Sequence, residues 1–91
     1  MDAPNRRIEF RQAADVAGVG RGSAIPCAGI RVGDILLAVI KYNAGIIAGL
    51  DVSRFRVLDG AVISDSVDTS AYRVHVVWVD DDTTREVLRG I

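Results

Sequence analysis

Short apolar runs separated by glycine, asparagine and aspartate dominate the chain from residue 23 onward. The clearest run is YRVHVVWV, residues 72–79. Because successive side chains of a strand point to opposite sides, this run divides into two faces. One face carries Tyr72, Val74, Val76 and Trp78, and the other carries Arg73, His75, Val77 and Val79. The pattern predicts a strand with one face in the core and the other partly exposed to solvent or covered by another surface.

Two turn signals mark further strands. In AGIRVGDILLAVI, residues 28–40, two glycines and an aspartate predict a turn that leads into an apolar strand over 35–42. An Asp59-Gly60 pair between two apolar stretches is a common hairpin signal. The polar residues 80–84 end the strand before them, and residues 85–91 could add a last short strand. Several short strands with turns between them predict an all-β fold, either a small sandwich or a barrel-like domain.

The first 22 residues differ from the rest, because charges are mixed with isolated apolar residues and glycines close the segment. We therefore divide the chain into an irregular N-terminal arm, residues 1–22, and a single β domain, residues 23–91. The arm allows a short helix over 12–17, although an isolated helix of that length is marginal in water. Phe10 is a large apolar residue in this polar segment, and it requires a surface to bury against, either on its own domain or on a partner.

Composition limits the classes of function. The 91 residues suffice for one domain with a modest core, and 49% apolar and 25% charged residues are typical of a folded globular protein. A net charge of −1 gives no general attraction to nucleic acid or to an anionic membrane, so neither is an expected partner. No apolar run approaches the length of a membrane span, and the N-terminus lacks the apolar stretch of a signal peptide, which predicts synthesis in the cytoplasm.

Few residues offer candidate chemistry, and no cofactor or metal ion is expected. Cys27 is the only cysteine, and its expected role is that of a small buried apolar side chain. His75, the only histidine, is expected on a strand surface. The run Asp80-Asp81-Asp82 lacks the spaced ligands and loop glycine of a calcium loop, and residues 18–22 lack the lysine and hydroxyl residue of a phosphate-binding loop. The sequence therefore indicates a protein that is not an enzyme.

The segment AGIRVGDILLAVI resembles the centre of a PDZ domain, where a similar glycine and aspartate pattern joins a short helix to a core strand. The resemblance covers residues 28–40 and implies a peptide-binding module. In such a module residues 18–22 would have to form the carboxylate-binding loop. The helix that lines the peptide groove would have to come from residues 51–66, which are typical of strand and turn. We keep this function as an alternative.

A longer pattern resembles small virion proteins of tailed bacteriophages, of the capsid decoration or cement type. It begins with the turn and strand of residues 28–40 and continues with DVSRFRV, residues 51–57. A polar DTS stretch at 68–70 then leads into a final apolar strand that ends in VWVD at 77–80. The resemblance extends over residues 23–82, about two thirds of the chain.

This resemblance implies a structural virion protein without an active site, made in the host cytoplasm and located on the capsid surface. Its implied partner is the major capsid protein, whose lattice it stabilises, and its implied assembly is a homotrimer or another homo-oligomer. A mean hydropathy of +0.25 is high for a small soluble monomer and agrees with an adhesive surface. A head-tail or tail component is the alternative within the same class. The residues expected to reach across the capsid protein lie in the arm: Arg6, Arg7, Ile8, Phe10 and Arg11.

Overall fold

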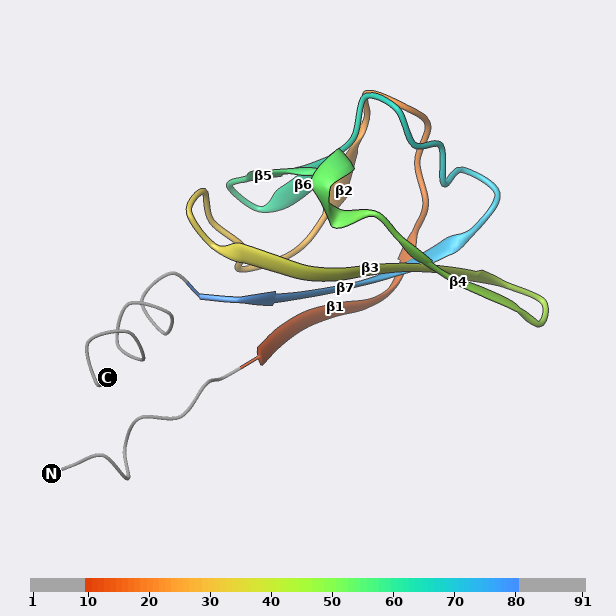
Figure 1. The fold of residues 1–91 in the computed structure, drawn as a ribbon, viewed down its shortest axis with the longest axis horizontal. Coiled ribbons are helices and arrows are strands. Elements are labelled where there is room, and N and C mark those ends of the chain that lie inside the picture. The colour runs from red at the N-terminus through yellow and green to blue at the C-terminus, as the bar shows by residue number, and fades with distance from the viewer. Residues whose placement is uncertain (1–9, 81–91) are drawn as a thin grey trace, which may run out of the picture.

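A computed structural model describes residues 10–80 and shows two antiparallel β-sheets that lie in separate layers (Figure 1). The larger sheet has the strand order β1 (Phe10–Ala17), β7 (Arg73–Val79), β3 (Ile35–Asn43) and β4 (Ile46–Leu50). The smaller sheet has the order β2 (Ala24–Pro26), β6 (Ala61–Ile63) and β5 (Arg56–Leu58). One turn of 3-10 helix, η2 (Val52–Arg54), connects β4 to β5. The predicted all-β, sandwich-like fold is confirmed.

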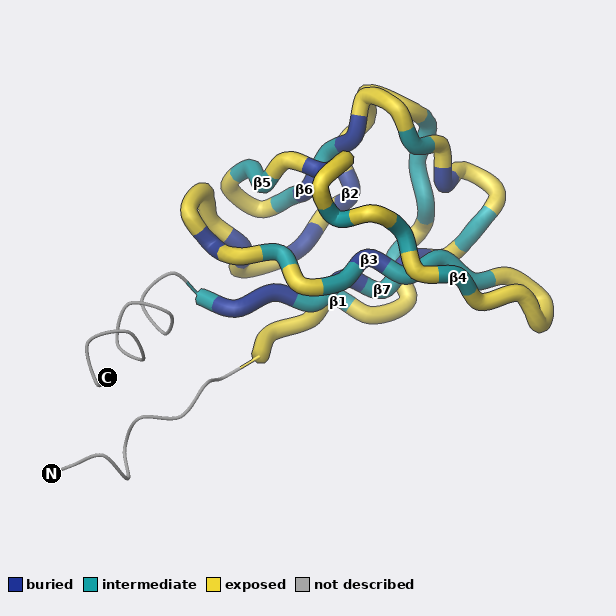
Figure 2. Tube along the Cα trace, in the orientation of Figure 1, coloured by how far each residue is buried: buried dark blue, intermediate teal, exposed yellow. Residues whose placement is uncertain are grey.

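The core lies between the two sheets, and β7 contributes more buried side chains to it than any other strand. The expected inward face of this strand is confirmed, because Val74 and Val76 are 0% exposed and Trp78 is 1% exposed. They form one apolar cluster with side chains from both sheets and the connecting loops: Ile25, Cys27, Ile30, Val39, Phe55 and Val62. Burying a side chain of this size stabilises the folded state by about 1.5–3 kcal/mol. Figure 2 shows β7 as the most continuously buried strand of the larger sheet.

The glycine and aspartate turn before β3 forms as the sequence predicts. Gly29 and Gly33 have φ angles of +94° and +102°, a region that glycine occupies without steric cost. The buried Asp34 side chain accepts a hydrogen bond from the Arg31 backbone N–H at 2.9 Å, which closes the second part of the turn. Ile30 lies between the two glycines and is 1% exposed. The motif therefore shapes the backbone and places one core side chain.

Both short hairpins follow from local turn chemistry. The predicted Asp59-Gly60 hairpin is confirmed, because Leu58 of β5 pairs with Ala61 of β6 across these two residues. A second hairpin joins β3 to β4, and there Asn43 pairs with Ile46. Its two loop residues, Ala44 and Gly45, have φ angles of +41° and +92°, as the tight turns favoured in two-residue hairpins require. Strand β4 was not among the sequence-based predictions.

The expectation of an irregular arm was wrong for residues 10–17, and so was the short helix over 12–17. These residues form the edge strand β1, which pairs with β7 along its length. Hydrogen bonds to β7 pair the backbone N–H and C=O groups of these residues. A short isolated helix over the same residues would be only marginally stable in water. A bulge between Ala13 and Val16 changes the phase of the strand, so that both side chains pack against the core. This phase change hides the two-residue alternation in the sequence.

Candidate interaction surface

We call the side of the larger sheet that faces away from the smaller sheet the outer face. Strand alternation defines it, because the inward positions of β7 are the buried Val74, Val76 and Trp78, and their neighbours along the strand point the other way. Cross-strand partners share a face, so the strand register assigns the other positions. By this register the outer face carries Phe10, Gln12, Ala17, Ile35, Ala38, Ile40, Tyr42, Ile47, Gly49, Arg73, His75, Val77 and Val79. The bulge residue Asp15 belongs to the same face through its hydrogen bonds with Arg73 and Tyr42.

An apolar row crosses one end of the outer face. Phe10 on β1 and Ile35 on β3 are both in register with Val79 on β7, which lies between them. Phe10 is 65% exposed and Ile35 is 44% exposed, whereas Val79 is buried. The exposed start of β1 is visible in Figure 2. Phe10, the residue for which the sequence required a surface, is therefore presented on the outer face rather than buried in its own core.

The other arm residues expected to contact a partner divide into two groups. Arg6, Arg7 and Ile8 lie outside the described residues. Arg11 lies in β1 next to Phe10, and its Nε donates a hydrogen bond to Asp80 Oδ2 at 2.6 Å. This ion pair ties the start of β1 to the end of β7. The structure therefore places Phe10 at the surface and gives Arg11 an intramolecular role.

A charged cluster occupies the opposite end of the outer face and attaches β1 to the sheet. Asp15 is the bulge residue with a φ of +56°, and its Oδ1 accepts hydrogen bonds from Arg73 Nε at 2.9 Å and from the Tyr42 hydroxyl at 2.8 Å. Arg73 also donates to the Asp15 carbonyl oxygen. The three side chains come from β1, β7 and β3. One carboxylate thus connects the edge strand to the two strands beyond it.

These contacts change the pKa values of two groups in the cluster. The hydrogen bond from Arg73, followed by that from Tyr42, lowers the pKa of Asp15 below its ordinary value of 3.8. Burial, followed by the hydrogen bond to Asp15, raises the pKa of Tyr42 above its ordinary value of 10.0. Because folding lowers the pKa of Asp15, its contribution to stability is present above pH 3.8 and is lost as the pH falls through the lower value in the folded protein.

We expect Asp15→Asn to make the stability of the protein less sensitive to acid. Asparagine tolerates the left-handed backbone of this position and keeps a side-chain acceptor, but it has no charge to lose. Urea unfolding at pH 7 and at pH 3 measures the effect as the change in midpoint between the two conditions. That change should be smaller in the variant than in the wild-type protein. An equal change in both proteins would show that Asp15 does not carry this pH dependence.

His75 lies in the middle of the outer face, between the apolar row and the charged cluster. Its Nε2 is 2.7 Å from Gln12 Oε1 on the neighbouring strand β1. Ile40 of β3 is its cross-strand partner on the other side. The predicted strand-surface position is confirmed, and the contact with Gln12 gives the histidine a role in joining β1 to β7.

Cys27 is buried, as the sequence predicts. Its side chain is 0% exposed, and burial raises the pKa of the thiol to about 11. The thiol therefore stays protonated near neutral pH, and the protonated form is a poor nucleophile and a poor metal ligand. Cys27 acts as a small apolar residue at the end of β2, next to the turn that leads to β3.

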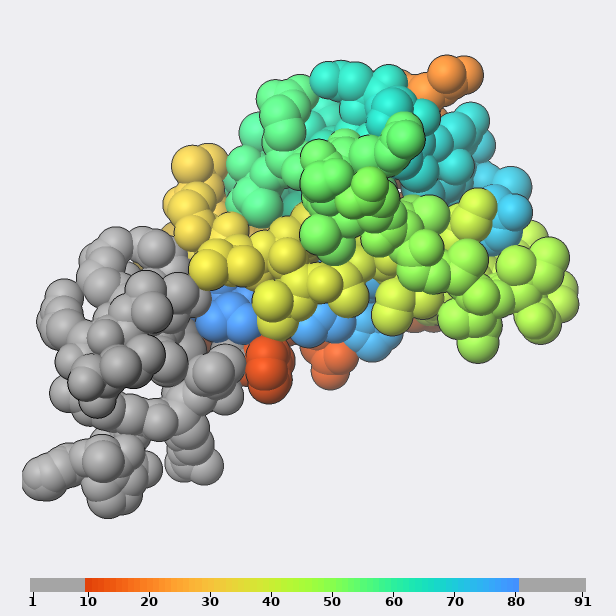
Figure 3. All heavy atoms as spheres, viewed as in Figure 1, coloured from red at the N-terminus to blue at the C-terminus, as the bar shows by residue number. Residues whose placement is uncertain are grey.

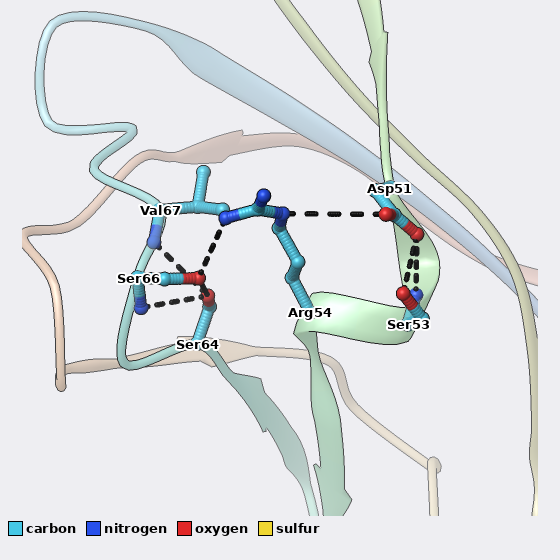
Figure 4. A network of polar contacts seen from close by, with 6 residues as sticks. All are labelled: Asp51, Ser53, Arg54, Ser64, Ser66 and Val67. Atoms are coloured by element: carbon cyan, nitrogen blue, oxygen red, sulfur yellow. Dashed lines mark hydrogen bonds and ion pairs between the residues drawn. The ribbon is translucent and has the colours of Figure 1, made fainter.

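A polar network joins η2 to the loop after β6 (Figure 4). Asp51 Oδ1 accepts hydrogen bonds from the Ser53 backbone N–H and hydroxyl, at 3.0 and 2.6 Å, and so caps η2. Ser64 Oγ accepts from the backbone N–H groups of Ser66 and Val67, at 3.2 and 3.1 Å. Arg54 Nη1 donates to Ser66 Oγ at 3.4 Å, which connects the two turns. The side chains of Asp51, Ser64 and Ser66 therefore hold the conformation of these two turns.

The glycine-rich segment 18–22 uses its backbone to hold the fold together. Gly18 N–H donates to the Tyr72 carbonyl at 2.9 Å, and Gly22 N–H donates to the Ser64 carbonyl at 2.8 Å. Val19 exchanges hydrogen bonds with the buried Thr69, whose Oγ1 accepts from the Val19 N–H at 2.9 Å. Three N–H groups that a carboxylate-binding or phosphate-binding loop would direct at its ligand are thus engaged within the protein.

The segment that would have to provide a PDZ-like groove helix has a different structure. Residues 51–66 contain η2, β5 and β6, and no α-helix is present anywhere in the described range 10–80. The likeness to a PDZ domain is therefore confined to the turn and strand of residues 28–40. We do not carry the peptide-binding alternative further.

Two exposed isoleucines at the β3–β4 hairpin were missed by the sequence-based predictions. Ile46 is 57% exposed and Ile47 is 77% exposed, and the hairpin protrudes from the rest of the fold (Figures 1 and 3). The signal was present, because Asn43-Ala44-Gly45 followed by the uncharged run IIAGL is a turn followed by a strand. With the apolar row at Phe10, this hairpin provides a second exposed apolar area on the larger sheet.

Comparison with known proteins does not assign the chain to a family. No protein-family model, curated protein or solved structure matches the chain. Residues 10–80 contain no group of histidine, cysteine, aspartate and glutamate side chains arranged to hold a metal ion. In the same residues, no helix has the length and apolar character needed to cross a membrane.

Proposed function

We propose that this protein is a non-enzymatic structural protein of a bacteriophage virion, and that it binds the major capsid protein lattice as a decoration or cement protein. The observation that supports this proposal most directly is the exposed apolar row at the end of the outer face, where Phe10 and Ile35 flank Val79. A large exposed aromatic residue on a strand is well suited to anchor a protein contact. The class of partner comes from the sequence resemblance over residues 23–82.

The surroundings of Phe10 suit such a contact. Phe10 begins an edge strand that is fixed to β7 at both ends, by the ion pair of Arg11 with Asp80 and by the contacts of Asp15 with Arg73. Less side-chain and backbone freedom is therefore lost on binding than for a residue on a free tail. Many copies on one lattice also act together, so each single contact can be weak. The assembly that the resemblance implies, a homotrimer or another homo-oligomer, stays a prediction.

We expect Phe10→Ser to lower binding to capsids by about tenfold or more, because burial of a phenylalanine contributes about 1.5–3 kcal/mol. The measurement is co-sedimentation of the purified full chain with heads assembled from the major capsid protein of the same genome. Val32→Ser is the matched control, because Val32 is 67% exposed but lies in the turn before β3, outside the outer face. The control variant should bind as the wild type does.

The outcomes of this experiment test the capsid-binding function and the proposed contact surface separately. If the wild-type protein does not sediment with the heads even when the heads are in excess, the proposed capsid-binding function is wrong. If the wild-type protein and the Phe10→Ser variant bind the heads equally well, the capsid-binding function is supported but the apolar row is not the contact surface. Circular dichroism of each variant should show a retained fold, because both substituted residues are mostly exposed.

A further inference from the structure

The two edges of the larger sheet are built differently. The free edge of β1 carries Arg11 and Asp15, and it is interrupted by the bulge at Asp15. Charges and bulges are the usual features that prevent an edge strand from pairing with another chain. The other edge strand, β4, has the sequence IIAGL, with no charge, no proline and a regular register to β3. Of these two edges in the described sheet, only β4 lacks such protection.

The register shows which backbone groups of β4 face outward. In a hairpin with a two-residue loop, the residues that flank the loop form a hydrogen-bonded pair, and such pairs then alternate with non-bonded pairs. Asn43 and Ile46 flank the loop, so Ile46, Ala48 and Leu50 exchange hydrogen bonds with β3. The N–H and C=O groups of the two residues between them, Ile47 and Gly49, therefore point to the free edge.

We propose that β4 pairs with β4 of a second copy of this chain, antiparallel and centred on Ala48, to form one continuous sheet across a two-fold axis. In this register Ile47 of each copy is opposite Gly49 of the other. These are the residues whose backbone groups face the edge, so each such pair exchanges both of its hydrogen bonds. Ala48 meets Ala48 of the second copy at the axis as a non-bonded pair.

The side chains of β4 complement one another in this register. Ile47 is 77% exposed, and Gly49 has open space where a side chain would be, because a Cβ there would meet nothing within 4 Å. The large side chain of one copy thus covers the gap left by the glycine of the other. Ile46 is opposite Leu50 on the inner side, which again places two apolar side chains together. A strand that is complementary to itself favours a second copy as the occupant.

Charge does not oppose the pairing. The adjoining strand β3 has one charged side chain, Lys41, which is the cross-strand partner of Ala48. Its ammonium group lies 4.3 Å from the centre of the Tyr72 ring within its own chain. The hairpin also protrudes from the fold, which makes its edge accessible to another molecule (Figure 3). This inference rests on β4 alone and does not depend on the capsid-binding function.

A cysteine at the two-fold axis tests the register directly. In Ala48→Cys, the two new thiols would belong to a non-bonded antiparallel pair with Cα atoms about 4.5 Å apart, a distance within the range of disulfides. With oxidised glutathione, most of the full chain should run as a covalent dimer on a non-reducing gel. Ile46→Cys is the matched control, because Ile46 lies in the same strand but faces Leu50 of the other copy. It should form at least about tenfold less dimer.

Sedimentation over a range of protein concentrations tests the pairing without a cross-link. The wild-type mass should approach twice the 9.8 kDa of one chain as concentration rises. Ile47→Lys should raise the dissociation constant of the dimer by about tenfold or more, because it removes the apolar cover over Gly49. Val32→Lys adds the same charge at an exposed position outside β4 and should leave the constant unchanged.

Several results would overturn the proposal. A wild-type mass of one chain at all concentrations would exclude the pair, and a mass of three chains would favour the homotrimer implied by the resemblance. Equal effects of Ile47→Lys and Val32→Lys would show that charge, not the β4 edge, controls association. Equal cross-linking of Ala48→Cys and Ile46→Cys would exclude the register. Binding of β4 only to the capsid protein would appear as monomers in solution and would likewise contradict self-pairing.

Discussion

Gly18→Ala should lower the free energy of unfolding by about 3 kcal/mol, because the position has no room for a Cβ atom. An added Cβ would overlap the Thr69 carbonyl oxygen and lie only 2.6 Å from the Tyr72 carbonyl oxygen. Both are backbone atoms, so a side-chain rotation cannot relieve the overlap. The backbone would have to move and would weaken the hydrogen bond from Gly18 N–H to Tyr72. Urea unfolding monitored by circular dichroism measures the loss.

Gly20→Ala is the control for this substitution. Gly20 lies in the same glycine-rich segment, but a Cβ there meets nothing within 4 Å and its φ is not in the left-handed region. The variant should have wild-type stability or gain about 0.4–1 kcal/mol, because alanine restricts the unfolded chain. If Gly18→Ala were as stable as Gly20→Ala, the close approach of residues 18 and 69–72 would not be a constraint on this fold.

Trp78→Ala should lower the free energy of unfolding by about 4 kcal/mol, the range found when a large core aromatic residue is truncated. Trp78 is 1% exposed and lies on β7, the strand that contributes most to the core cluster. The truncation leaves a cavity between the two sheets that the surrounding strands cannot fill. Denaturant unfolding followed by circular dichroism is the suitable measurement, because the variant has no tryptophan fluorescence.

Trp78→Phe should cost much less, about 1 kcal/mol. The Trp78 Nε1–H is buried and has no acceptor among the described residues. Leaving such a donor unpaired costs about 1–3 kcal/mol, and phenylalanine removes the donor while it keeps most of the ring. The gain from removing the donor offsets part of the loss from the smaller side chain. A cost for Trp78→Phe as large as that for Trp78→Ala would show that the indole nitrogen has a partner in solution.

The candidate interaction surface could be predicted only in part. The sequence directed attention to Phe10 as an apolar residue that needs a surface, and the structure places it on the outer face, 65% exposed. The role of Arg11 could not be foreseen, because its partner Asp80 is 69 residues away in the sequence. The hairpin residues Ile46 and Ile47 had a turn signal before them, but their exposure depends on which strands surround β4. Burial is a property of the assembled sheet, and an apolar run alone does not distinguish a core strand from an edge strand.

Features that depend on neighbouring residues could be predicted from the amino-acid sequence. These are the glycine and aspartate turn before β3, the Asp59-Gly60 hairpin, and the alternation that places Val74, Val76 and Trp78 on one face of β7. Each depends on backbone angles or on a two-residue period, and both are local properties. The all-β class follows from their sum.

The position of β1, the outer face and the contrast between the two sheet edges depend on contacts between strands that are distant in the sequence. Strand β1 is stabilised by β7, and the contact of Asp15 with Arg73 joins residues 58 positions apart. No local preference specifies such a pairing, because its free energy exists only when distant strands meet. The bulge at Asp15 then sets the phase of β1 and protects that edge, while β4 remains open at the other.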